Sequence, residues 1–243
     1  MTGRRRPPPG EPIPSPNIWQ WPQIYEVENR AQDADGSLFA ALREVVGWAG
    51  RDIVDIGCGT GFHLPEFARD ARSVTGVEPH PPLVPPARDR IAGMPGVRVL
   101  EGSAEHLPLP DRSVDVAHAR TAYFFGPGCG PGISEAMRVL RPGGTLVVVD
   151  LDATVGEYGE WMRADLPHYD PAAVESFFAA QGFDLTRVVS RWEFPDRRAL
   201  RAVLGIEFGP RVAERAFGQV PGLSIDVGYR IHTRRAPSGL VLG

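Results

Sequence analysis

The sequence predicts an α/β protein in which a parallel sheet is covered by helices on both faces. Short apolar, β-branched runs alternate with segments whose apolar residues recur at helical spacing. The first such run, residues 53–56, breaks into glycines at Gly57, Gly59 and Gly61, and the next run ends on Glu78. A strand, a glycine turn, a helix and a strand that ends on an acid are typical of α/β proteins that bind a nucleoside.

The first elements follow from these periodicities. Residues 18–48 predict two amphipathic helices, separated by a polar break at residues 33–36. Strands are predicted over residues 52–57, 73–78, 97–101, 114–119 and 145–151, with helices between them. The helix around residues 83–92 must start late or bend, because Pro85 and Pro86 lack backbone donors. The Arg141–Gly144 segment predicts a type II turn.

The alternation of predicted strands and helices is less regular after Asp152. A helix is predicted over residues 170–181, because Asp170 suits the N-cap and Pro171 the first helical position. Strands are predicted over residues 185–194 and 223–233. Between them, residues 198–217 predict one or two helices.

The composition narrows the class of protein. A chain of 243 residues can bury a full core as one domain. Its net charge of −4 argues against a nucleic-acid partner. Residues 1–17, rich in Pro, Gly and Arg, are expected to be a disordered tail. No apolar run suits a membrane span or a secretory signal, and the two cysteines suit neither a metal site nor a disulfide framework. A cytoplasmic protein without a metal or a membrane partner is therefore expected.

The glycine spacing separates two kinds of nucleotide site. A dinucleotide fold would need a third glycine where Phe62 or Leu64 stands. The chain contains no lysine, which excludes a phosphate-binding P-loop. The pattern that fits is Asp-x-Gly-x-Gly-x-Gly, starting at Asp55.

With these motifs, residues 50–152 resemble the class I S-adenosylmethionine-dependent methyltransferases of the small type 11 kind. The resemblance implies a Rossmann-like, doubly wound, mostly parallel seven-stranded sheet with an antiparallel last strand and an N-terminal helical lid. It divides residues 18–243 into a lid (18–49), a cofactor-binding core (50–152) and substrate-side helices with C-terminal strands (153–243).

The resemblance also implies which residues bind the cofactor. Gly57, Gly59 and Gly61 would pass under its methionine tail, beside the N-terminus of the next helix. Asp55 would anchor the glycine loop or the amino group, and Glu78 would bind the ribose hydroxyls.

Three further segments complete the predicted cofactor site. Ser103 and Ala104 stand in the family's third motif, where an aspartate would accept from adenine; the Ser103 hydroxyl is a weaker acceptor. Arg120 would pair with a carboxylate or the loop backbone. A purely structural salt bridge is an equally good interpretation of this arginine. Tyr25, in the lid, would close over the methionine tail.

Two residues are candidates for catalysis. Tyr123 begins an aromatic run, residues 123–125, at a strand end that faces the ligand side of the sheet. His168 lies in the variable region after the fifth strand, where loops determine substrate choice. His118 is expected instead to be a buried histidine with its hydrogen bonds satisfied.

The predicted function is methyl transfer from S-adenosylmethionine to a small-molecule acceptor, at an O, N or C nucleophile, by a monomer or homodimer. The same fold could serve a non-methylating reaction such as cyclisation or decarboxylation. An NAD-dependent oxidoreductase does not fit the glycine spacing, and a non-catalytic binding module stays an alternative.

Overall fold

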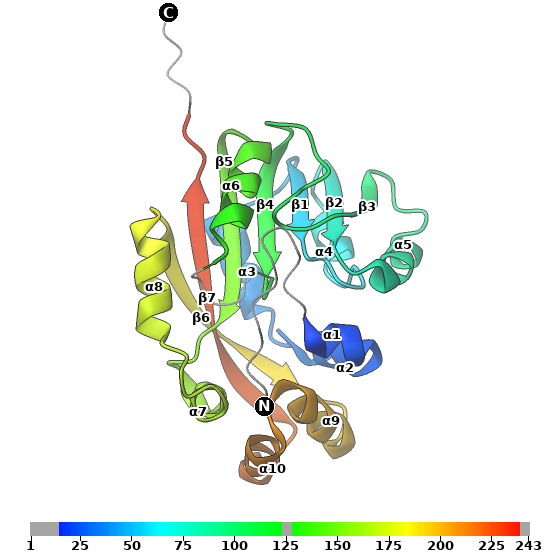
Figure 1. Ribbon diagram of the computed structural model, residues 1–243. Helices are drawn as coiled ribbons and strands as arrows, with labels where there is room; N and C mark the ends of the chain where they lie inside the picture. Colours follow the sequence, from blue (N-terminus) through cyan, green and yellow to red (C-terminus); the bar gives the residue numbers. More distant parts are fainter. Residues whose placement is uncertain (1–14, 123–127, 239–243) are drawn as a thin grey trace, which may run out of the picture.

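The computed structural model describes residues 15–122 and 128–238. It has a seven-stranded sheet with the order β3-β2-β1-β4-β5-β7-β6. The strands are β1 (Asp52–Ile56), β2 (Ser73–Glu78), β3 (Val97–Glu101), β4 (Val114–Arg120), β5 (Leu140–Leu151), β6 (Asp184–Glu193) and β7 (Ser224–Arg235). The first five strands pair in parallel, whereas β7 runs antiparallel to both β5 and β6. The predicted sheet is thereby confirmed (Figure 1).

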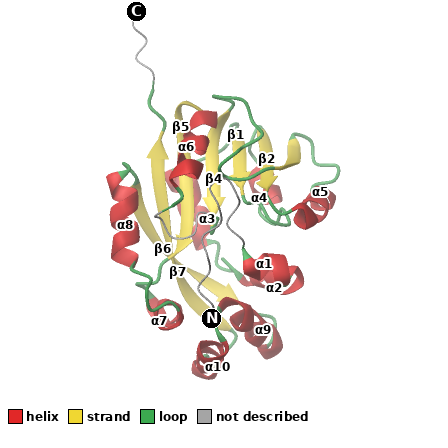
Figure 2. Ribbon diagram, in the orientation of Figure 1, coloured by secondary structure: helices red, strands yellow, loops and turns green. Residues whose placement is uncertain are grey.

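Helices precede the sheet and connect its strands (Figure 2). They are α1 (Pro16–Gln20), α2 (Pro22–Ala31), α3 (Ser37–Val45), α4 (Leu64–Ala68), α5 (Val84–Arg90), α6 (Gly130–Val139), α7 (Gly156–Asp165), α8 (Pro171–Ala180), α9 (Arg197–Glu207) and α10 (Pro210–Gln219).

Alternation along the strands creates two separate cores. Ile53 and Val147 belong to the cluster that also holds the buried residues of α3, α4 and α5. Their neighbours Val54 and Val148 belong to the opposite cluster, with the buried residues of α6 and α8. Successive side chains of a strand point to opposite faces, so apolar runs such as these are buried on both sides.

The helix caps, prolines and turn glycines of the sequence have the expected positions in the structure. The Asp170 carboxylate caps α8 by accepting from Ala172 N and Ala173 N. Pro85 lies in the first turn of α5, where a missing N–H costs no helical hydrogen bond. Gly143 has a φ of 78°, which the third position of a type II turn requires. Both α9 and α10 lie between β6 and β7, as expected.

The strand predicted over residues 145–151 begins earlier, because β5 spans Leu140–Leu151 and includes the segment predicted as a turn. Two further differences concern the helices. Residues 18–48 form three helices instead of two, because Trp21 separates α1 from α2 before the expected break. The second difference is α7, which periodicity did not indicate. Its Tyr158 and Trp161 are buried against β7, α9 and α10, so long-range packing stabilises this helix.

The carboxyl ends of the parallel strands all meet at one end of the sheet. Figure 1 shows α1 and α2 below the carboxyl ends of β1 and β2, with α9 and α10 beside them. Helix α2 contacts α9 directly. In open α/β sheets this end binds ligands, and here helices from both ends of the chain cover it.

Within residues 15–122 and 128–238, no helix combines the length and the apolar character that crossing a membrane requires.

The packing of α8 on the sheet predicts a difference between two adjacent phenylalanines. Phe178 is fully buried, stacks on His232 with ring centroids 4.2 Å apart, and contacts Phe183, whereas Phe177 is only half-buried. We expect Phe178→Ala to lower the free energy of unfolding by about 3–5 kcal/mol, because it leaves a core cavity. The matched Phe177→Ala should cost about 1 kcal/mol. Urea unfolding measures both; equal losses would contradict this account of the packing.

Candidate functional site

The loop after β1 is shaped by its three glycines. Gly57, Gly59 and Gly61 all have positive φ, between 57° and 74°, which other residues adopt only under strain. A Cβ at Gly57 would lie 2.9 Å from Ala122 Cβ. The Gly57 N–H donates to Val77 O at 2.8 Å, which holds the loop against the end of β2. The loop can therefore approach its neighbours, and a ligand, with its bare backbone.

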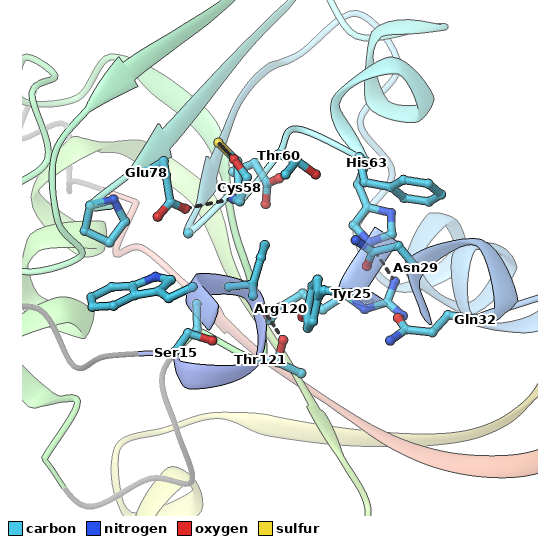
Figure 3. Close-up of a pocket in the computed structure, with 18 residues that line it drawn as sticks. Ser15, Tyr25, Asn29, Gln32, Cys58, Thr60, His63, Glu78, Arg120 and Thr121 are labelled. Atoms are coloured by element: carbon cyan, nitrogen blue, oxygen red, sulfur yellow. Dashed lines mark hydrogen bonds between the residues drawn. The ribbon is translucent and has the colours of Figure 1, made fainter. Parts of the chain in front are cut away.

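Glu78 is buried at the carboxyl end of β2, with 3% of its surface exposed. Its Oε2 accepts from Gly59 N and its Oε1 from His80 N, each at 2.8 Å. Burial raises the pKa of Glu78 from 4.5 to about 7, although both backbone hydrogen bonds oppose the shift. Glu78 thus joins the glycine loop to β2 and places a carboxyl group in the cleft (Figure 3).

Asp55 and His118 form a buried pair on neighbouring strands. They stand opposite each other in the register of β1 and β4, and His118 Nδ1 lies 2.7 Å from Asp55 Oδ1. His118 Nε2 has no hydrogen-bond partner among the described residues. An imidazole that donates from Nδ1 fixes the orientation of the Asp55 carboxylate, which lines the same cleft as Glu78.

Arg120 connects three elements at the end of β4. Its guanidinium donates to Gln32 Oε1 of α2, and lies 3.3 Å from both Tyr229 Oη and His63 Nε2. Burial, followed by the charge of Arg120, holds the pKa of His63 well below 6.5, so neutral His63 accepts from the guanidinium. None of the Arg120 partners within the described chain is a carboxylate, so a cation faces the cleft without an acidic partner.

The cleft between these groups encloses about 780 Å³, including open solvent at its mouth. Helices α1 and α2 close it from the side opposite the glycine loop (Figure 3). Trp19 of α1 lines the cleft and stacks on His80, with ring centroids 4.3 Å apart.

A second cavity adjoins this cleft and encloses about 1050 Å³, again with open solvent included. Four residues line both spaces: Ser15, Tyr25, Gln32 and Thr121. The rest of its wall comes from α1, α2, α7, the end of β5, β7 and the end of α9. A group bound in the cleft could therefore face a group bound in the second cavity across Tyr25 and Thr121.

Two glutamates meet in the wall of the second cavity, Glu28 of α2 and Glu207 of α9. Glu207 accepts from Tyr158 Oη at 2.6 Å and from Asn17 Nδ2 at 2.5 Å. Burial, together with the neighbouring Glu207, raises the pKa of Glu28 well above 4.5. Because two buried carboxylates in contact cannot both ionise, the two glutamates share one proton.

The predicted cofactor residues fall into two groups. Asp55, Gly57, Gly59, Glu78, Arg120 and Tyr25 line the cleft. Gly61 lies beneath it, where a Cβ would be 3.2 Å from Leu64 Cδ1. Ser103 and Ala104 are half-buried just after β3 and do not line it; their loop is joined to β2 by Gly102 N, which donates to Glu78 O.

The predicted catalytic residues do not meet at the cleft in the described structure. His168 is exposed in the turn after α7 and lines neither cavity. Tyr123 and the rest of the 123–125 aromatic run lie outside the described residues, as do residues 1–14 of the predicted tail.

Sequence reasoning identified Tyr25 but missed the rest of its polar helix face. Glu28 and Asn29 of α2, and Gln32 just after it, also line one or both cavities. Their spacing of three, four and seven residues from Tyr25 marks a single face of a helix, which a search for polar as well as apolar periodicity would have found. Glu207 carried no comparable signal, because its partner lies far away in the chain.

Part of this chain resembles known proteins. Residues 54–148 match the family described as "Methyltransferase domain". The chain is 33% identical over 120 residues to malonyl-acyl carrier protein O-methyltransferase of Pectobacterium atrosepticum, covering 48% of this chain and 46% of that protein. It spans about half the length of the curated relatives that it matches.

Two solved structures share the fold at low sequence identity. A SAM dependent methyltransferase from Aquifex aeolicus superposes with a TM-score of 0.56 at 18% identity, over 87% of this chain and 97% of that one. The 4+2 cyclase SpnF superposes with a TM-score of 0.55 at 24% identity, over 83% of this chain and 80% of that one.

The burial of Glu78 predicts a pH dependence of stability. Between its unfolded pKa and its folded pKa of about 7, the folded protein keeps a proton that the unfolded chain has lost, so this contribution to stability falls as the pH rises. Glu78→Gln removes the titration. Relative to the unmodified protein, we expect the free energy of unfolding of Glu78→Gln to rise by about 2–3 kcal/mol from about pH 5 to pH 8.

Urea unfolding of both ligand-free proteins across this pH range measures the difference. A difference that stays constant with pH would show that Glu78 has an ordinary pKa in the fold.

Proposed function

Because this chain carries a class I S-adenosylmethionine-dependent methyltransferase domain, we propose that it transfers a methyl group from S-adenosylmethionine to a small-molecule acceptor. The observation that carries the proposal is the cleft itself. It combines a glycine loop, a buried carboxyl group at the end of β2 and an arginine with no acidic partner in the described chain. A zwitterionic nucleoside needs these three groups.

The residues of the cleft fit the parts of this cofactor. Glu78 lies at the strand end where the ribose hydroxyls of a nucleoside would bind. Arg120 offers its guanidinium to the methionine carboxylate, which would supply the missing counter-charge. Asp55, held by His118, offers a carboxylate to the methionine amino group. Trp19 and His80 form a flat aromatic wall near the end of β2.

The second cavity is the proposed place of the acceptor. Bound S-adenosylmethionine supplies a methyl group on a positively charged sulfur, which becomes a neutral thioether when the acceptor's lone pair takes the methyl group. Because the donor is already activated, the main tasks of the protein are to align the two molecules and to exclude water. Tyr25 and Thr121, shared by both cavities, would define the passage between them.

We assign residues to cofactor binding but none to catalysis. His168 would need to move from its exposed turn to reach either cavity, so we do not give it a role in proton transfer. The role of Tyr123 stays a prediction from the sequence. The same is true of the cytoplasmic location, of a monomeric or homodimeric state, and of the absence of nucleic-acid and membrane partners.

The second candidate is a reaction that keeps the methyl group on the cofactor. The likeness to a cyclase concerns the fold alone, but it demonstrates that this architecture also serves a different chemistry. The two candidates differ in one product, because only methyl transfer converts S-adenosylmethionine to S-adenosylhomocysteine.

Incubation of the protein with S-adenosylmethionine labelled in its methyl group and a metabolite extract tests the function. We expect label in a small-molecule product and an equal amount of S-adenosylhomocysteine, both dependent on the protein. A new product without label or S-adenosylhomocysteine would support the second candidate and overturn methyl transfer.

Glu78→Ala tests the cofactor site. We expect the affinity for S-adenosylhomocysteine, measured by calorimetry, to fall at least about tenfold, because hydrogen bonds to a carboxylate are lost. Glu101→Ala is the matched control, because Glu101 is the exposed partner of Glu78 in the register of β2 and β3. Equal affinities of the two variants would exclude Glu78 from ribose binding.

A further inference from the structure

The second cavity has an unusual balance of charge. Its described lining contains four acidic residues, Glu28, Asp150, Asp165 and Glu207, and no arginine or histidine. Apolar and aromatic residues form most of the remaining wall. Two arginines flank the cavity without lining it: Arg120 faces the ring of Tyr229, and Arg230 stands opposite Asp150 in the register of β5 and β7. The described lining itself therefore offers acceptors for a cation and no basic group for an anion.

Asp150 is the residue of this wall that most needs a partner. Only 1% of its surface is exposed, and its Oδ2 has no hydrogen-bond donor among the described residues. Arg230 stands opposite it in the register of β5 and β7, but its guanidinium donates to Tyr169 Oη, Leu151 O and Pro171 O. A buried carboxylate without a donor is costly, so a ligand that supplies a donor here gains binding energy.

The Glu28–Glu207 pair adds a second acceptor to the same wall. Gln32 donates to Glu28 Oε1 at 2.7 Å, but no residue of the described chain donates to Glu28 Oε2. A cation beside the pair would stabilise the ionised form of both glutamates, because it replaces the shared proton with a compensating charge.

The aromatic and apolar residues suit the rest of such a ligand. Tyr25 and Phe208 line the cavity with aromatic rings, which favour a nearby cation, whereas the ring of Tyr229 already faces Arg120 at 5.3 Å. Met162 and Leu166 offer apolar contact to a carbon skeleton. An anionic acceptor, such as a malonyl carboxylate, would instead meet four acidic residues without a basic one.

We propose, on the basis of the methyl-transfer function above, that the acceptor carries a cationic nitrogen, an ammonium group, held in the second cavity by Asp150 and the Glu28–Glu207 pair. The ammonium donates to Asp150 Oδ2, and its carbon skeleton lies against Met162 and Leu166. The charge selects the class of acceptor and orients it toward the passage lined by Tyr25 and Thr121.

Three probes of matched shape test the charge preference: 2-phenylethylamine, 2-phenylethanol and 3-phenylpropionate. Each is titrated by calorimetry into the full chain saturated with S-adenosylhomocysteine, near neutral pH. We expect the amine to bind at least about tenfold more tightly than the alcohol, because a charge-assisted hydrogen bond is added, and the acid not to bind.

Three variants test whether the acidic residues of the second cavity cause the preference for the amine over the alcohol. Asp150→Asn should abolish the advantage of the amine over the alcohol, and Glu28→Gln should reduce it. Asp184→Asn, an exposed carboxylate of β6 outside both cavities, should leave it unchanged. Affinity for S-adenosylhomocysteine, measured in the same samples, reports whether each variant is folded. If Asp150→Asn does not fold, the result for Glu28→Gln decides the test.

Three binding results would overturn the proposal: no amine binding to the unmodified protein, alcohol or acid bound as tightly as the amine, or an amine preference unchanged in folded Asp150→Asn and Glu28→Gln. Methyl transfer to an uncharged acceptor would overturn the proposal but leave the proposed function intact. Failure of S-adenosylhomocysteine to bind the unmodified protein would instead contradict the proposed function.

Discussion

The hydrogen bond from Gly59 N to the Glu78 carboxyl group is the interaction on which the site depends. It crosses from the loop after β1 to the end of β2, so it sets the distance between the two elements that line the cleft. A side chain at Gly59 would both strain the backbone and lie 2.6 Å from Ile18 Cδ1. The same glycine therefore positions the acid and admits the covering helix α1.

Burial gives the two cavities different electrostatic character. In the cleft, Arg120 lacks an acidic partner within the described chain, whereas in the adjoining cavity Asp150 lacks a donor for its Oδ2. A buried polar group without a hydrogen-bond partner is costly, and a ligand that supplies the partner gains binding energy. On our proposals the cleft binds an anionic group and the second cavity a cationic one, with Tyr25 and Thr121 between them.

The fold was largely predictable, because its signals are local. Strands β2 and β3 have the predicted bounds, and the caps and turns at Asp170 and Gly143 follow residue preferences that act within a few positions. The resemblance to a known family supplied the antiparallel order of the last strands. Helix α7 was missed, because buried contacts to distant elements stabilise it rather than its own periodicity.

The sequence by itself determined the cofactor half of the site. Asp55, the glycines and Glu78 belong to two successive strands and their loop, and parallel strands bring their carboxyl ends together without further information. Only the tertiary structure decided the second cavity, where we propose that the acceptor binds. Glu28 and Glu207 meet because α2 packs on α9, and residues of α1, α2, α7 and α9 enclose the cavity that Asp150 lines. Such enclosure depends on contacts between segments far apart in the chain, which no local pattern encodes.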